Sequence, residues 1–183
     1  AVSDFPGRAA LNVALNALMG LPSVVVGVLV YLALSRSGPL GSYGLLYSPS
    51  AMIIAQSMLV VPLIAAVTRQ IVEDVWKDYA QEFSLIGLSR SQSVMLLLAD
   101  CRFSLTVAAL AGLGRAMSEV GAVMIVGGNI DGYTRVMTTA IALETSKGDL
   151  ALSIALGLVL MSLILAINIA IHGLRTWASR RYG

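Results

Sequence analysis

The sequence predicts an all-α protein, a polytopic bundle of membrane-spanning helices. Of its 183 residues, 57% are hydrophobic and only 12% are charged, and the mean hydropathy is +0.85. Soluble domains are about 45–50% apolar and about 25% charged, so a water-soluble domain of this composition would lack the polar surface to cover its core. The same figures exclude a disordered chain, a basic nucleic-acid-binding domain and a disulfide-stapled secreted domain.

Three uncharged apolar runs are long enough to cross a bilayer, which takes about 20 residues. The first covers residues 9–35 and contains Pro22, a residue that marks a kink when it lies inside a membrane helix. The second covers residues 51–68, with Pro62 near its end, and the third covers residues 150–171. These runs predict three spanning helices.

Residues 103–126 are predicted to form a fourth spanning helix although they contain two charges. Arg115 and Glu119 are four residues apart, so on a helix their side chains can pair. Because a charge at membrane depth costs at least about 2.5–3.5 kcal/mol, the pair needs a reason to be there. Either it holds two helices in register, or Arg115 attracts an anion while Glu119 keeps that attraction weak enough for release. Ala108, Gly112 and Ala116 add a small-residue face for close helix contact.

The distribution of basic residues predicts the orientation of these helices. If both ends of the chain and the central polar segment are cytoplasmic, Arg115 is in the membrane and the other eleven Lys and Arg divide eight inside to three outside. The eight inner residues are Arg8, Arg69, Lys77, Arg90, Arg102, Arg175, Arg180 and Arg181, and the outer ones are Arg36, Arg135 and Lys147. This bias follows the positive-inside rule, which predicts a multi-pass protein with both ends of this chain in the cytoplasm.

The central segment, residues 69–102, is predicted to contain an amphipathic cytoplasmic helix. Apolar residues recur there at helical spacing, and Gly87 is a natural helix end. These apolar positions are Val72, Val75, Trp76, Tyr79, Phe83 and Ile86. The polar face is mainly acidic, whereas helices that lie on lipid favour Lys and Arg. The pattern therefore favours docking to another protein, with an interfacial helix on lipid as the alternative.

The end of this helix resembles the coupling loop of ABC-transporter permeases. The usual form is Glu-Ala-Ala, three residues and Gly, followed about eleven residues later by Leu-Pro. Here residues 81–87 read QEFSLIG, so Gln81 replaces the Glu and the Ala pair is absent, and Ala99-Asp100 stands where Leu-Pro is expected. The resemblance implies a coupling helix at about residues 72–87 that contacts an ATPase subunit. The implied contact residues are Trp76, Tyr79, Gln81, Glu82, Phe83 and Gly87.

More specific matches to the molybdate, tungstate and sulfate permeases lie elsewhere in the chain. Residues 114–122 (GRAMSEVGA) resemble the Ala-Arg-x-x-Gly-Glu-Phe-Gly-Ala stretch of that family, and residues 127–135 (GGNIDGYTR) its Gly-Asn-Ile-x-Gly-x-Thr signature. Residues 21–27 (LPSVVVG) resemble its paired-proline helix, with Ser23 for the second proline. The Ser-Glu-Val-Gly-Ala variant and residues 142–149 (ALETSKGD) are closest to the tungstate-type permeases.

The resemblance implies the fold of type I, molybdate-permease-like importers, as a single domain over residues 1–183 with about four spanning helices. The family's first membrane helix is expected to be missing from this chain. Also implied are a homodimer in a prokaryotic plasma membrane, two ABC ATPase subunits and an extracytoplasmic oxyanion-binding protein. The expected cargo is tungstate, with molybdate or sulfate as the alternative. Arg115, Glu119 and Gly121 are candidates for the pathway, its gate or a structural pair, and Asn129, Thr134 and Arg135 for the outer surface that meets the binding protein.

The sequence offers no catalytic machinery of its own. It contains no Walker A pattern, so ATP is expected to be bound and hydrolysed by a separate subunit. No His, Cys, Asp and Glu pattern predicts a metal site, and no Ser or Cys has a predicted base nearby, so no cofactor is expected. Two other classes remain as weaker alternatives. One is a passive anion channel, and the other is an intramembrane enzyme using Glu119 or Asp100.

Overall fold

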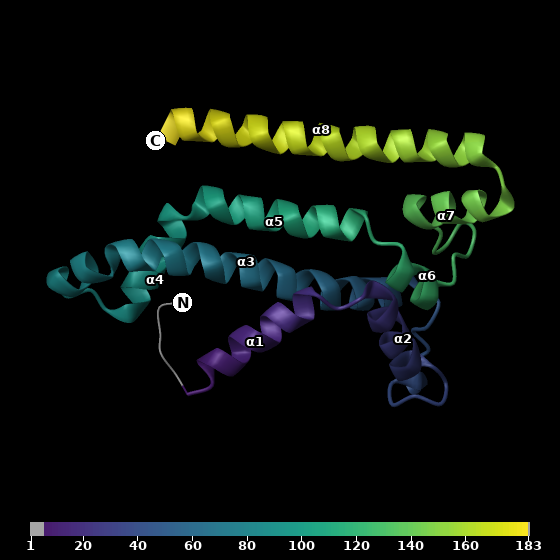
Figure 1. The fold of residues 1–183 in the computed structure, drawn as a ribbon, viewed down its shortest axis with the longest axis horizontal. Coiled ribbons are helices and arrows are strands. Elements are labelled where there is room, and N and C mark those ends of the chain that lie inside the picture. The colour runs from purple at the N-terminus through teal and green to yellow at the C-terminus, as the bar shows by residue number, and fades with distance from the viewer. Residues whose placement is uncertain (1–5, 183) are drawn as a thin grey trace. The chain divides into compact units, whose positions relative to one another are not determined.

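The structure is a computed structural model that describes residues 6–182, apart from the side chains of Arg90 and of residues 174–182. Every regular element in this range is helical, which confirms the predicted all-α class. The elements in chain order are α1 (Arg8–Met19), α2 (Ser23–Leu34), the 3₁₀ turn η1 (Gly41–Tyr43), α3 (Pro49–Ile86), α4 (Arg90–Asp100), α5 (Arg102–Met117), α6 (Gly121–Gly127), α7 (Met137–Lys147) and α8 (Leu150–Tyr182) (Figure 1).

The chain forms two compact units. The first comprises Ala1–Gly20 and Val61–Leu113, so it contains α1, the second part of α3, α4 and most of α5. The second comprises Leu21–Val60 and Gly114–Gly183, so it contains α2, η1, the first part of α3, α6, α7 and α8. Each candidate site below lies within one unit.

The core of the second unit lies where α2, the first part of α3 and α6 pack together. Its buried residues are Val26, Val30, Leu34, Ala51, Met52, Ala55, Leu59, Ala122, Val123 and Val126. At the centre of the packing, a Cβ on Gly27 would lie 2.8 Å from the Cα of Ala122. The glycine therefore lets the backbones of α2 and α6 approach more closely than any larger residue would allow.

The predicted kink at Pro22 is a complete break between two helices. Helix α1 ends at Met19, and the Gly20 N–H bonds the Ala17 and Leu18 carbonyls. Pro22 has an extended backbone and precedes the first residue of α2. Proline has no N–H to continue a helix, and its ring restricts the preceding residue to extended conformations, so Gly20 and Pro22 together separate the two segments.

The second apolar run and the predicted amphipathic helix form one continuous helix, α3, of 38 residues with Pro62 inside it. The change in polarity after Thr68 marks a change of surroundings, and no helix-ending residue accompanies it. The predicted end is confirmed, because Gly87 has a φ of +73°. The N–H groups of Gly87 and Leu88 bond the carbonyls of Ser84 and Phe83, which closes the last turn.

The prediction of one helix over residues 103–126 is wrong, because α5 ends at Met117 and α6 begins at Gly121. Where the helix would continue, the Glu119 carboxylate accepts a hydrogen bond from the Ala122 N–H at 3.0 Å. This cap satisfies a backbone donor at the start of α6, which makes a new helix start favourable at this point.

Two helices of the described chain are long and apolar enough to cross a membrane by length and composition, namely α3 and α8. The number rises to four if the pairs α1 with α2 and Ser91–Asp100 with α5 each form one span. Within Leu150–Gly173 of α8, the most apolar stretch has a mean hydropathy of 2.8, and 6% of that stretch is buried. Few residues of the third predicted run are therefore buried within the second unit.

Candidate functional site

Glu119 is the most buried charged residue of the predicted pathway segment, with 5% of its surface exposed. Its Oε1 accepts the Ala122 N–H, and its Oε2 lies 3.8 Å from Nη2 of Arg115. Its backbone carbonyl accepts a hydrogen bond of 3.0 Å from the Thr138 hydroxyl of α7. Glu119 therefore joins the end of α5, the start of α6 and the start of α7.

Arg115 is much less enclosed than its partner. Its side chain is 40% exposed, against 4% for Glu119, and the 3.8 Å ion pair is longer than an ordinary charge-assisted hydrogen bond. At the next residue, the Gln56 side chain of α3 donates a hydrogen bond of 3.2 Å to the Ala116 carbonyl. The end of α5 is thus fixed by backbone contacts, while the Arg115 guanidinium keeps an open side.

Gly121, the third residue of this candidate site, is a packing position. A Cβ there would lie 2.9 Å from Cγ2 of Val24 and 3.1 Å from Oγ of Ser23. A larger residue would therefore push α6 away from the first turn of α2. Gly121 and Gly27 together set the distance between these two helices.

The candidate outer loop, residues 127–135, is a tight loop held together by Thr134. The Thr134 hydroxyl donates to the Gly127 carbonyl at 2.6 Å and accepts the Ile130 N–H at 2.9 Å. Only 2% of Thr134 is exposed, so it lies inside the loop and not on its surface. Gly128 has a φ of +70°, and a Cβ there would meet the ring of Tyr47 at 2.8 Å. Gly127 and Gly128 thus end α6, and Gly128 lets the loop pack directly against the ring of Tyr47.

Asn129 and Arg135 are half-buried, and the residues between them from Ile130 to Tyr133 are exposed. Arg135 Nη1 donates to Asp131 Oδ1 at 2.8 Å, and its Nη2 lies 3.5 Å from the Asn129 carbonyl. In the part of the chain that the structure describes, Asn129 Oδ1 and Arg135 Nε are buried without a hydrogen-bond partner. These two atoms therefore leave hydrogen-bonding capacity unused inside the loop.

Three aromatic residues of the predicted coupling segment lie together at the end of α3. The Phe83 ring lies 5.7 Å from the Tyr79 ring in a stacked arrangement and 6.1 Å from the Trp76 ring. Helical spacing places the three side chains on one face. Gln81 and Glu82 are exposed on the same segment, and Gly87 ends it.

Beyond the aromatic cluster, α3 ends in exposed apolar residues. Leu85 is 88% exposed and Ile86 is 72% exposed. Beside them is a groove of about 480 Å³ lined by Tyr79, Phe83, Leu96, Leu97, Ala99, Asp100, Arg102 and Phe103. Exposed apolar surface beside an open groove is typical of protein contact sites.

A carboxylate held by two arginines lies earlier on α3, a feature that the sequence analysis did not find. Glu73 Oε1 accepts a hydrogen bond from Nη2 of Arg8 at 2.9 Å, and its Oε2 accepts one from Nη1 of Arg69 at 3.0 Å. The Arg8 hydrogen bond is the main cause that lowers the pKa of Glu73 below its usual value. Arg8 and Glu73 are 65 residues apart, so only the i,i+4 pair of Arg69 and Glu73 could have been found from spacing.

The described residues contain no group of three or more His, Cys, Asp and Glu that could hold a metal ion. Cys101 is buried, and burial raises the pKa of its thiol, which disfavours the reactive thiolate. The features described above are thus packing contacts, ion pairs and exposed apolar side chains.

Comparison with known proteins gives the same picture. No family model matches the chain. The chain is 43% identical to the tungstate uptake system permease protein TupB of Peptoclostridium acidaminophilum, over 95% of this chain and 76% of that protein. It is 42% identical to a probable anion ABC transporter permease protein of Haloferax volcanii, over 90% and 73% respectively. It is 36% identical to TupB of Campylobacter jejuni, over 94% and 72%.

The apolar helices of spanning length and the similarity to permeases identify a multi-pass membrane protein, a transporter component and not an enzyme. The chain belongs to the family of anion ABC-transporter permeases that contains these three relatives. The resemblance found in residues 114–122 and 127–135 is thereby confirmed at the level of the family.

Proposed function

We propose that this chain is the membrane-spanning subunit of an ATP-driven importer whose cargo is tungstate. The observation that carries the proposal is the match over at least 94% of the chain to two permeases named for tungstate uptake. The protein lies in the plasma membrane of a prokaryote, with both ends of this chain in the cytoplasm. Two copies form the pathway, ATP is bound and hydrolysed by two separate ABC ATPase subunits, and an extracytoplasmic binding protein delivers the anion.

In this proposal the ATPase docks on the end of α3. The exposed side chains of Leu85 and Ile86 and the adjacent groove support this assignment, because an isolated chain gains nothing from leaving such residues in water. The acidic polar face of the segment suits a protein partner better than anionic lipid. ATP binding draws the two docking segments of the dimer together and opens the pathway outward, and hydrolysis resets it.

Glu119 and Arg115 have different roles in this proposal. Glu119 is a structural residue, as supported by its 4% exposed side chain and its bond to the Ala122 N–H. Arg115 draws the anion along the pathway, as supported by its open side and its long ion pair. The partial neutralisation by Glu119 keeps the attraction weak enough for the anion to leave. On the outer face, the binding protein contacts Asn129 and Arg135, while Thr134 maintains the loop from inside.

The test is tungsten and molybdenum uptake by cells with and without the gene, counted by elemental mass spectrometry with excess sulfate as competitor. We expect tungsten uptake that depends on the gene and persists in sulfate. Uptake of molybdenum or sulfate in its place would leave the family assignment intact and contradict tungstate as the cargo.

A Glu82→Lys variant tests the docking assignment, since it should lower uptake while the permease still inserts. Uptake at the wild-type level in this variant would contradict the docking surface.

A further inference from the structure

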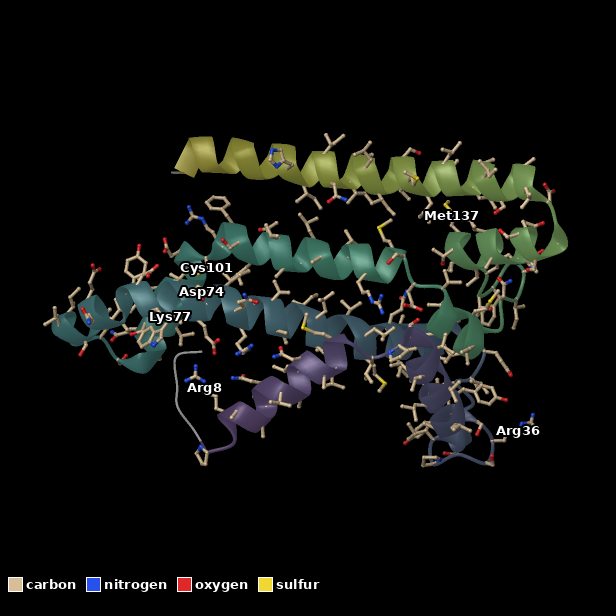
Figure 2. The ribbon with its side chains drawn as sticks, in the orientation of Figure 1. Arg8, Arg36, Asp74, Lys77, Cys101 and Met137 are labelled. Carbon is tan, nitrogen blue, oxygen red and sulfur yellow. The ribbon has the colours of Figure 1, made fainter. Side chains whose placement is uncertain are left out.

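Arg8, Arg69 and Glu73 form a contact outside the docking, pathway and outer-loop sites described above. Glu73 receives hydrogen bonds from both arginines, and the three side chains are only 20–31% exposed. The neighbouring pair of Lys77 and Asp74 differs sharply, with side chains 63–74% exposed (Figure 2). Exposed ion pairs of that kind contribute little to stability. A partly buried carboxylate between two guanidinium groups forms stronger hydrogen bonds with a more defined geometry.

The contact joins two elements that the chain does not place next to each other. Arg8 is the first residue of α1, and Glu73 lies in the second part of α3, within the same compact unit. Arg69 lies one turn before Glu73 on α3 and orients the carboxylate. A local pair of Arg69 and Glu73 could stabilise α3 alone, but the bond from Arg8 fastens the start of α1 to it.

The position of Glu73 along α3 matters for transmission of movement. It precedes Trp76 by three residues, and Ile86 by thirteen, which corresponds to about 20 Å at a rise of about 1.5 Å per residue. The intervening turns are regular helix, and the rings of Trp76, Tyr79 and Phe83 pack along them. A displacement applied at the end of α3 therefore reaches Glu73 through one continuous helix.

We propose that Glu73, held between Arg8 and Arg69, is the positioning residue that makes α1 move with the ATPase-docking end of α3. The inference rests on the proposed function, since it assumes that a partner pushes or pulls on that end. Without the contact, the partner would still move α3, but α1 would not follow. ATP hydrolysis would then continue while transport per ATP falls.

The experiment uses the complete complex of permease, ATPase and binding protein in liposomes. Glu73→Gln and Arg8→Gln remove the charge of one partner, and Asp74→Asn is the matched control on the adjacent residue. In the double variant Arg8→Glu with Glu73→Arg, a carboxylate from α1 again faces two guanidinium groups of α3. Two quantities are measured, namely tungstate transported per ATP hydrolysed and the ATP-dependent change in amide hydrogen exchange of α1.

We expect Glu73→Gln and Arg8→Gln to keep ATP hydrolysis while transport per ATP falls at least about fivefold, the low end of typical coupling between sites. The hydrogen-exchange response of α1 to ATP should disappear in both variants and return in the charge-swapped one, and Asp74→Asn should resemble the wild type. An α1 response that survives Glu73→Gln would overturn the inference. So would activity that falls only in proportion to the amount of assembled complex, because the contact would then be structural.

The exchange measurement does not depend on the cargo. If wild-type complexes hydrolyse ATP but move no tungstate, the proposed function fails at the substrate. The response of α1 in wild type and Glu73→Gln still decides the inference in that case. An absence of any α1 response to ATP in the wild type would overturn it as well.

Discussion

The crossing of α2 and α6 and the end of α3 use apolar residues in opposite ways. At the crossing, Gly27 and Ala122 bring two backbones into contact, and Ala122, Val123 and Val126 are at most 1% exposed. At the end of α3, by contrast, Leu85 and Ile86 are 88% and 72% exposed. We therefore expect substitutions in the first region to act on the fold of this chain, and substitutions in the second to act on the proposed docking of the ATPase.

The largest effect on folding is expected at Gly27, where the backbones of α2 and α6 are in contact. In Gly27→Val, the new side chain meets the Ala122 backbone, which has no flexible end to move aside. Overpacking of this kind costs about 1–3 kcal/mol or more, so the yield of monodisperse protein in detergent should fall severalfold. Gly157→Val is the control, because a Cβ at Gly157 meets nothing within 4 Å. Equal yields for the two variants would contradict the account of the crossing.

Ile86→Asp tests the other region. The side chain is exposed, so the thermal stability of the isolated permease should change by no more than about 0.5 kcal/mol. Copurification of the ATPase should fall about tenfold, as expected for loss of an apolar anchor worth about 1–2 kcal/mol. If Ile86→Asp lowers permease stability and leaves ATPase binding intact, the residue belongs to the fold and the contrast between the regions fails.

Glu119→Ala removes the cap at the start of α6 and should destabilise the permease by about 0.5–2 kcal/mol. Glu119→Gln keeps an oxygen acceptor for the Ala122 N–H, so it should lie closer to the wild type in thermal stability. An equal loss of thermal stability in the two variants would show that charge pairing with Arg115, which both remove, is what the site requires, and not the hydrogen bond to Ala122.

The smallest expected effect concerns Cys101, a buried residue of the first unit. It is 3% exposed, and burial raises the pKa of its thiol. Maleimide labelling at neutral pH should therefore be slow, and it should accelerate when the pH is raised or the protein is unfolded. A cysteine placed at exposed Ser91 in a Cys101→Ser background supplies the fast reference. Equal labelling rates would contradict the buried position of Cys101.

Local signals in the sequence predicted the elements that depend on local chemistry. The all-α class follows from composition, and the end of α3 follows from Gly87, because only a residue that accepts positive φ closes that turn well. The continuity of α3 was missed because the change in polarity near Thr68 was interpreted as a boundary between two helices. The break before α6 had a readable signal, since Glu119 precedes the start of a helix and can cap it, but spacing alone suggested only the pair with Arg115.

Long-range contacts could not be predicted from one sequence. The close approach of Gly27 to Ala122 depends on how two distant helices cross, and no property of residues 21–27 fixes that partner. Likewise, Arg8 and Glu73 are separated by 65 residues of chain. Thr134 is a third example. The sequence identified it as part of the 127–135 signature, but its burial could not be predicted, because it results from the way the loop folds around its hydroxyl.

The most direct test of the account is tungstate accumulation in liposomes that contain the permease, its ATPase and its binding protein, with ATP supplied on the ATPase side. We predict accumulation against a concentration gradient that stops when the ATPase is omitted or when Ile86→Asp prevents its docking. Tungstate that instead equilibrates through the permease alone, at the same rate with and without ATP, would identify a passive channel and contradict the account.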